Sequence, residues 1–327
     1  MRNYLVQQEQ HTRSPAFESG MRKAMEPYLR KARLQRERCR NRTALQVDAS
    51  IAGSVGVPYI PLRVERPFLF DEYSYPLHEI LARALQVDNL ANVHELRLRP
   101  EELLKPLLDP QQRREFHEAY DGFVTSFCIP LLHSLAIAKN LLHASSSSQI
   151  VYRYQAFPSI RVLQPGATAV APICDTAVGH SLACLRFHIP LTPSFASNAL
   201  YTESHPGRED WHPLTAKSVG LGYLFDSARC LYFEMENTTN VTRVSLDFCV
   251  MIYREFYGKM TDDGGLTPQE LIEDRFSHAD PNFYEEAIID LGRSSLPGLE
   301  IVVKKCGQAV YDKPISRYVG LPFSTSR

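Results

Sequence analysis

Hydrophobic and polar positions follow a helical period in the first half of the chain. Between residues 16 and 42, apolar side chains recur every three or four positions among strong helix formers, which predicts an amphipathic helix. Its apolar stripe is formed by Met21, Met25, Tyr28, Leu29 and Ala32. The same period returns from about residue 75 to 144 and predicts a second helical region.

The longest predicted helix of that region begins after Asp109, an N-cap residue followed by proline at the first helical position. Large apolar side chains recur along it at helical spacing, namely Phe116, Tyr120, Phe123, Phe127 and then Leu131 or Leu132. Such a stripe is typical of a helix that packs on a core, and we interpret it as packing and not as a cofactor site.

From Ile150 the pattern changes to period two in residues that favour strands. Seven or eight short runs, separated by Pro, Gly and Asn turns, fill about a hundred residues. This pattern predicts an antiparallel barrel or jelly roll with the preceding helices on one outer face. Beyond residue 254 we expect helices at 267–276 and around 281–291, and a last strand at 299–305.

Charge sets the N-terminal arm apart from the body. The first 50 residues carry eleven Lys or Arg and five Asp or Glu, whereas the whole chain has a formal charge of −1, so the remainder is near −7. No aromatic residues are interleaved with the arginines, which disfavours binding to nucleic acid. A basic amphipathic helix on a linker rich in Gly and Pro is instead suited to contact another protein subunit.

An arginine-rich start is typical of mitochondrial presequences. Such presequences contain few acidic residues, however, whereas this segment has Glu9, Glu18, Glu26 and Glu37. We find neither a secretory segment nor an apolar run near the 18 residues of a membrane span, so no transmembrane segment is expected. We therefore predict an intracellular protein, either mitochondrial or cytoplasmic. The seven dispersed cysteines contain no C-x-x-C pair, which favours reduced buried thiols over disulfides or a zinc site.

An ordered series of motifs gives residues 66–255 a family resemblance. In chain order they are YQAFPSIRVLQPG, DTAVGH, LRFHIPLT, NALYTES with PGREDWHPL, a Gly-rich strand ending in FD, and NTTNVTRVSLDF. The series resembles the Fe(II)/2-oxoglutarate dioxygenase superfamily, in the branch related to the streptomycin-biosynthesis protein StrG and to phytanoyl-CoA hydroxylase-like enzymes. The resemblance implies an α+β protein with a double-stranded β-helix core, a cupin-like jelly roll.

In that family, iron is held by a His-x-Asp motif and a second histidine, and an Arg-x-Ser pair holds 2-oxoglutarate. Aligned on these motifs, the ligand positions of this chain hold Ile173, Asp175 and Tyr232, and the Arg-x-Ser pair is Arg243 and Ser245. Isoleucine offers no donor atom, and a phenol with a pKa near 10 is a poor ligand for Fe(II). The resemblance therefore implies a degenerate site with no catalytic residues, no metal and no cofactor.

Other residues are poor substitutes for the missing ligands. Cys174 should point away from Asp175, because alternate residues of a strand face opposite sides. His180 would reach the site only if the connecting loop folded back. We interpret the other nearby histidines, His188, His205 and His212, as structural or surface residues.

Arg243 and Ser245 are predicted to face into the barrel, where a guanidinium needs an anionic or accepting partner. One interpretation is a vestigial site that still binds 2-oxoglutarate or another small carboxylate. The favoured interpretation is an internal ion pair with Asp175 or Asp226.

The leading hypothesis is a catalytically inactive oxygenase-like protein that serves as a structural or interaction subunit of a larger assembly, with helix 16–42 contacting other subunits. One alternative is an active Fe(II)/2-oxoglutarate-dependent hydroxylase with atypical ligands, and another is a metal-free module that binds a small carboxylate. Four parts are predicted: a basic helical arm and linker (1–65), helices packed on the barrel (66–149), the barrel core (150–255), and C-terminal helices and a strand that complete the domain (256–327).

Overall fold

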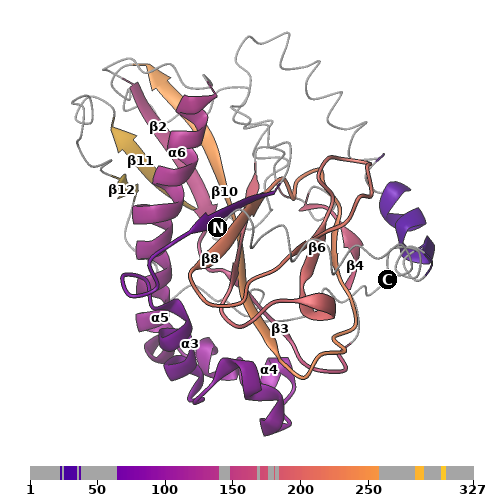
Figure 1. Cartoon of the computed structure of the whole chain (residues 1–327). Helices are drawn as coiled ribbons and strands as arrows, with labels where there is room; N and C mark the ends of the chain where they lie inside the picture. Colours follow the sequence, from indigo (N-terminus) through magenta and orange to yellow (C-terminus); the bar gives the residue numbers. More distant parts are fainter. Residues whose placement is uncertain are drawn as a thin grey trace.

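Helices and two antiparallel sheets make up the structure, a computed structural model of the α+β class (Figure 1). It describes residues 23, 26–34, 37, 65–139, 148–167, 170–175, 180, 184–257, 284–290 and 303–306. The α-helices are α3 (Leu77–Leu85), α4 (Pro100–Leu103), α5 (Pro110–Phe123) and α6 (Ile129–Ala138). Shorter turns are the 3-10 helices η1 (Leu90–Leu96), η2 (Lys105–Leu108) and η5 (Ala196–Asn198), and the π-helix η3 (Val124–Cys128) joins α5 to α6.

The larger sheet has the strand order β1-β8-β5-β10-β2-β11-β12, and β3 also pairs with β10. Its strands are β1 (Arg66–Leu69), β2 (Ser148–Gln155), β3 (Ser159–Leu163), β5 (Leu185–Pro190), β8 (Leu221–Phe225), β10 (Arg243–Tyr257), β11 (Tyr284–Asp290) and β12 (Val303–Cys306). The long strand β10 pairs with β5, β2 and β3, so it holds the sheet together.

The smaller sheet has the order β4-β9-β6-β7. Its strands are β4 (Val170–Ile173), β6 (Leu200–Thr202), β7 (His212–Leu214) and β9 (Tyr232–Glu234). Between β3 and β10 the chain passes back and forth between the two sheets, so side chains from both meet in one space. We call these inward-facing side chains the interior.

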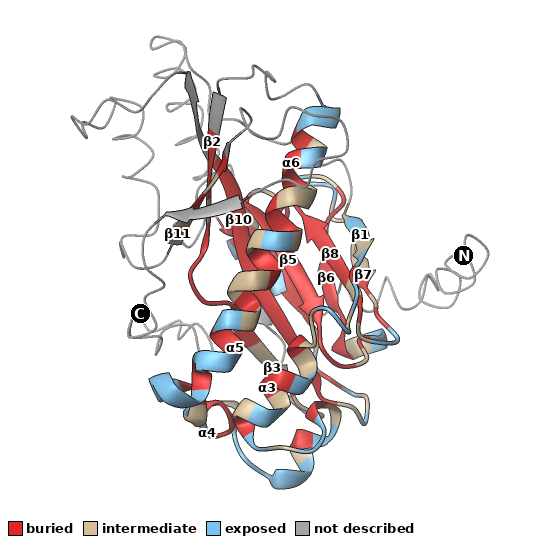
Figure 2. Ribbon diagram, turned by 90° about the vertical axis from the view of Figure 1, so that its left-hand side faces the viewer, coloured by how far each residue is buried: buried red, intermediate tan, exposed pale blue. Residues whose placement is uncertain are grey.

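The long helix formed by α5, η3 and α6 covers the outer face of the larger sheet (Figure 2). The aromatic stripe of this helix is buried, as the sequence predicted, and Phe116, Tyr120 and Phe123 are fully enclosed. The ring of Tyr120 meets Phe248 of β10 edge-on at 5.1 Å between centroids. Core packing therefore accounts for the periodic aromatics.

One helical stretch of the described chain, Pro110–Ala138, is long and apolar enough to cross a membrane by length and composition, although the sequence reading expected no such segment. This is weak evidence, because the core helix of a globular protein meets the same criteria. Here the buried side of the stretch packs in the same core cluster as β5 and β10.

Residues 26–34 are helical, in agreement with the predicted N-terminal helix, and lie on the outer side of the smaller sheet (Figure 1). Leu29 and Ala32 are buried there, in a cluster with Tyr201 and Phe233. Part of the apolar stripe, Leu29 and Ala32, therefore covers the chain's own sheet, and contact of the helix with another subunit stays a prediction for its other residues. Met21, Met25 and most of range 16–42 lie outside the described residues.

The predicted helix around 281–291 is wrong, because residues 284–290 form strand β11 between β2 and β12. Burial alternates along it, with Ala287 and Ile289 fully enclosed, and the open edge of β2 supplies hydrogen-bonding partners that outweigh helix propensity. The predicted last strand appears as β12, a few residues later than expected. The predicted helix at 267–276 lies outside the described residues.

Candidate functional site

The three residues that the sequence resemblance aligns with iron ligands lie together. Ile173 at the end of β4 is the Cα partner of Tyr232 on β9. Asp175 follows two residues later, and the Tyr232 hydroxyl donates a hydrogen bond to its Oδ1 at 2.7 Å. Tyr232, which the resemblance aligns with the second histidine, thus acts as a hydrogen-bond donor to Asp175.

Asp175 is completely buried, and its carboxylate is held by four side chains. Arg186 of β5 donates from Nε to Oδ2 at 3.1 Å and from Nη2 to Oδ1 at 2.5 Å. Ser227 also donates to Oδ2, and the Cys249 thiol donates to the same oxygen at 3.4 Å. Together with Tyr232, these groups satisfy both carboxylate oxygens.

Arg186 supplies the positive charge beside this carboxylate. Burial opposes ionisation of Asp175, but the Arg186 guanidinium overcomes it and lowers the pKa of Asp175 to about 2. The guanidinium carbon lies 5.0 Å from the centre of the Tyr232 ring. The sequence reading missed Arg186, although an arginine at an inward position of the buried strand LRFHIP was the available signal.

Arg243 does not pair with Asp175 or Asp226, so the partners expected from the sequence are wrong. The guanidinium forms an ion pair with Glu234 of β9, and its Nη1 donates to the carbonyl of Asn198 at 3.1 Å. Glu234 lies two residues after Tyr232, and therefore on the same inward face of β9. Asp226 instead pairs with a nearby arginine, Arg229.

Ser245, the second residue of the Arg-x-Ser pair, is fully buried beside Arg243 on β10. Within the described part of the chain, the Ser245 hydroxyl and the Arg243 Nε have no hydrogen-bonding partner. A small ligand or water could engage these two atoms, as it could His188 Nε2, which also has no hydrogen-bonding partner among the described residues.

A third ion pair continues the interior along β10. Asp247 forms an ion pair with Arg161 of β3, with 3.1 Å between Oδ2 and Nε, and contacts His188 Nδ1 of β5 at 2.8 Å. Burial lowers the pKa of His188, although Asp247 opposes the shift. Each of the three guanidinium groups therefore faces a carboxylate, and the interior is neutralised by the chain itself.

His180 lies next to the interior. From the sequence, we expected it to reach the site only if the connecting loop folded back. Its Nδ1 is 2.8 Å from the Tyr284 hydroxyl, and it lies close to Cys184 and Cys249. Cys174 points the other way, as expected, into the cluster under helix 26–34. His205 and His212 have polar partners near the surface, Ser204 and Asp210 respectively.

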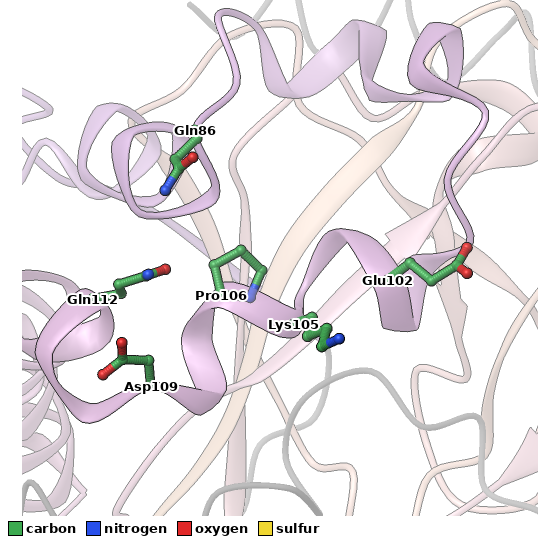
Figure 3. Close-up of a pocket in the computed structure, with 6 residues that line it drawn as sticks. All are labelled: Gln86, Glu102, Lys105, Pro106, Asp109 and Gln112. Carbon is green, nitrogen blue, oxygen red and sulfur yellow. The ribbon is translucent and has the colours of Figure 1, made fainter.

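Two hollows lie at the surface and away from the interior. The first, of about 380 Å³, is in the helical layer, where side chains of η2 and the start of α5 surround it (Figure 3). It is lined by Gln86, Glu102, Lys105, Pro106, Asp109 and Gln112. The second, of about 680 Å³, lies along the N-terminal helix beside Lys23, Glu26, Pro27 and Arg30.

No protein-family model and no curated protein sequence matches this chain. Similar solved structures include the nickel complex of the non-heme monooxygenase ThoJ, at 13% identity and a TM-score of 0.38, covering 65% of this chain and 91% of that chain. The apo form of ThoJ has 11% identity and a TM-score of 0.37, covering 62% of this chain and 79% of that chain. These values describe a weak likeness to an oxygenase fold and give no evidence for an enzymatic activity.

Proposed function

We propose that this chain is a catalytically inactive relative of the Fe(II)/2-oxoglutarate oxygenases that acts as a structural or interaction subunit of a larger protein assembly. One observation carries the proposal. Asp175, the one metal-type ligand at the three expected positions, is buried and held by Arg186 and Tyr232. An ion would have to displace a guanidinium to reach it.

The strand order supports a double-stranded β-helix as the core of this protein. Eight consecutive strands, β3 to β10, divide into the four-stranded orders β3-β10-β5-β8 and β4-β9-β6-β7. Two facing sheets built in this alternating way are typical of a jelly roll. The degenerate ligand positions then lie at strand ends that face the interior.

Side chains of the protein take the place of both charges that an oxygenase of this kind would bind. The guanidinium of Arg186 provides the cation beside Asp175, and the carboxylate of Glu234 provides the anion on Arg243. A set of internal ion pairs preserves the fold of the site while it removes the requirement for metal and co-substrate.

Iron binding and turnover test the loss of activity. Protein purified without oxygen and supplied with Fe(II) and 2-oxoglutarate should retain no iron and form no succinate. Stoichiometric iron together with succinate formation would falsify the proposal and support the active hydroxylase.

Restoring the missing ligands makes the test sharper. The variant Ile173→His, Tyr232→His should still bind iron poorly, because Arg186 continues to hold Asp175. Adding Arg186→Leu should raise iron affinity, since it releases the carboxylate. Equal iron affinity in the double and triple variants would show that Arg186 is not what blocks the site.

A second candidate, a metal-free module for a small carboxylate, is favoured by the unsatisfied Arg243 Nε and Ser245 Oγ. Under the leading proposal, 2-oxoglutarate without metal leaves the melting temperature unchanged, because Glu234 already occupies Arg243. A ligand at a hundred times its Kd would instead add about 2.7 kcal/mol. The matched variant Glu234→Ala should gain stabilisation by acetate or succinate, which confirms that the assay detects binding at Arg243.

The interaction role is supported by the outward side of helix 26–34. Tyr28 and Leu34 are 53% and 58% exposed there, next to the basic residues of the second hollow. We expect the native protein to migrate with a large complex, and Tyr28→Ala with Leu34→Ala to release it. Migration of the wild-type protein as a free monomer would contradict this role, and cell fractionation tests whether the compartment is mitochondrial or cytoplasmic.

A further inference from the structure

A cluster of metal-ligating side chains lies beside the degenerate iron site but shares none of its three positions. The donor atoms of His180, Cys184 and Cys249 all lie within 4.8 Å of one another, and all three residues are buried. They come from separate pieces of chain. Cys184 directly precedes β5, Cys249 lies within β10, and His180 follows β4.

The chemical nature of the three donor atoms indicates which metal ion would bind. Two thiolates and an imidazole suit Zn²⁺, whereas Fe(II) oxygenase chemistry uses nitrogen and carboxylate ligands with open positions. Bond lengths of about 2.3 Å to sulfur and about 2.0 Å to nitrogen place tetrahedral donors roughly 3.5 Å apart. The distances between donors, at most 4.8 Å, would therefore have to shorten by about 1.3 Å at most.

The surroundings of the cluster fit a bound ion. The Tyr284 hydroxyl lies 2.8 Å from His180 Nδ1 and 3.7 Å from Cys184 Sγ, so it fixes the imidazole as partners of metal-bound histidines do. A water molecule would complete four-coordination. Tyr284 belongs to β11, so the site would tie this added strand to the core sheet.

Charge balance also favours this occupant. A Zn²⁺ ion with two thiolates and a neutral imidazole carries no net charge, so it leaves the neighbouring ion pairs undisturbed. Cys249 donates to Asp175 when it is a thiol, and loss of that proton still leaves Asp175 with Arg186, Tyr232 and Ser227.

We propose that His180, Cys184 and Cys249 bind one Zn²⁺ ion, which joins the segment after β4 to β5 and β10. All three protein ligands are buried, and the site does not depend on the proposed loss of oxygenase activity. The spacing of the cysteines along the chain gave no sign of it, because the ligands meet only through the pairing of β5 with β10.

Metal analysis of the full-length protein tests the site. Protein loaded with Zn²⁺ under reducing conditions and then desalted should retain about one ion per chain. Cys184→Ala and Cys249→Ala should each weaken zinc binding at least about a hundredfold, whereas the matched control Cys128→Ala, a buried thiol of η3, should retain it.

Cobalt substitution of the wild-type chain provides a readout that does not require any variant to fold. Co²⁺ should give an intense thiolate charge-transfer band and the visible spectrum of a four-coordinate ion, and Zn²⁺ should abolish both. Retention of less than a tenth of an equivalent of zinc, a cobalt spectrum without thiolate bands, or unchanged zinc binding in Cys249→Ala would each overturn the proposal. A Cys184–Cys249 disulfide that persists under the reducing conditions of the zinc loading would also overturn the proposal.

Discussion

The two faces of strand β10 are built on different physical principles. Val244, Leu246 and Phe248 face the long helix and join a continuous apolar core. Asp247 and Arg243, at alternating positions, face the interior and form ion pairs. Apolar packing depends mainly on volume, whereas a buried charge depends on one particular partner. The two faces should therefore respond differently to substitution.

The largest effect is expected at Arg186. The substitution Arg186→Met removes the cation and leaves Asp175 buried beside uncharged donors, which should cost about 3–5 kcal/mol of unfolding free energy. Urea denaturation measures the loss. The double variant Arg186→Met, Asp175→Asn should recover most of it, because no uncompensated charge remains. A loss of less than about 1 kcal/mol in the single variant would show that water reaches this carboxylate.

On the opposite face, Leu246→Ala should cost about 3 kcal/mol, because it leaves a cavity in the core under the helix. The loss should be the same at low and high salt, since no charge is involved. Leu246→Met, which conserves volume, should cost less than about 1.5 kcal/mol and serves as the matched control in the same urea titrations.

The parts of the fold that the sequence predicted correctly are those that depend on residues close together along the chain. The stripe from Phe116 to Phe127 was identified because helix periodicity and burial coincide, and most core strands because alternation repeats between turn residues. Strand β11 was missed because its identity depends on the open edge of β2, which is far away in the sequence. Tertiary pairing overrode local propensity there.

Prediction of the site from the sequence was limited in the same way. Motif order indicated that Ile173, Asp175 and Tyr232 lie near one another, but not which side chains replace the metal. Arg186 and Glu234 belong to no motif of the sequence, and they reach Asp175 and Arg243 only because the two sheets face each other, with β9 in one sheet and β5 and β10 in the other.

Buried titratable groups on the two faces make the free energy of unfolding depend on pH. Burial lowers the pKa of His133, on the helix side, from an ordinary 6.5 to about 4. As the pH falls, the unfolded state therefore takes up this proton before the folded state does. Stability should fall by about 1–2 kcal/mol as pH drops from about 6.5 to about 4, after allowance for solvent screening. His188, on the interior side, has a pKa that burial also lowers and contributes in the same window, whereas the depressed pKa of Asp175 adds a loss of stability only below about pH 4.

The variant His133→Gln checks this assignment, because an amide can still reach the Tyr152 hydroxyl that His133 Nδ1 contacts at 2.8 Å. Unfolding free energies measured between pH 7 and pH 3 should lose the His133 share of the slope between 6.5 and 4, keep the share of His188, and keep the fall below 4. An unchanged slope in the upper window would assign it to another group.

The smallest effect is expected where an ion pair lies at the surface. Arg33 donates from Nε and Nη2 to Glu209 at 2.6 Å, a geometry as good as that of Arg186 with Asp175, but its side chain is 39% exposed. Water solvates both charges when the pair breaks, so Arg33→Ala should cost less than about 1 kcal/mol and the loss should shrink at high salt. Thermal denaturation at two salt concentrations measures it, with Arg30→Ala on the same helix as control. A loss that matches Arg186→Met would mean that the helix at residues 26–34 is held on the small sheet by this pair, and not by burial of Leu29 and Ala32.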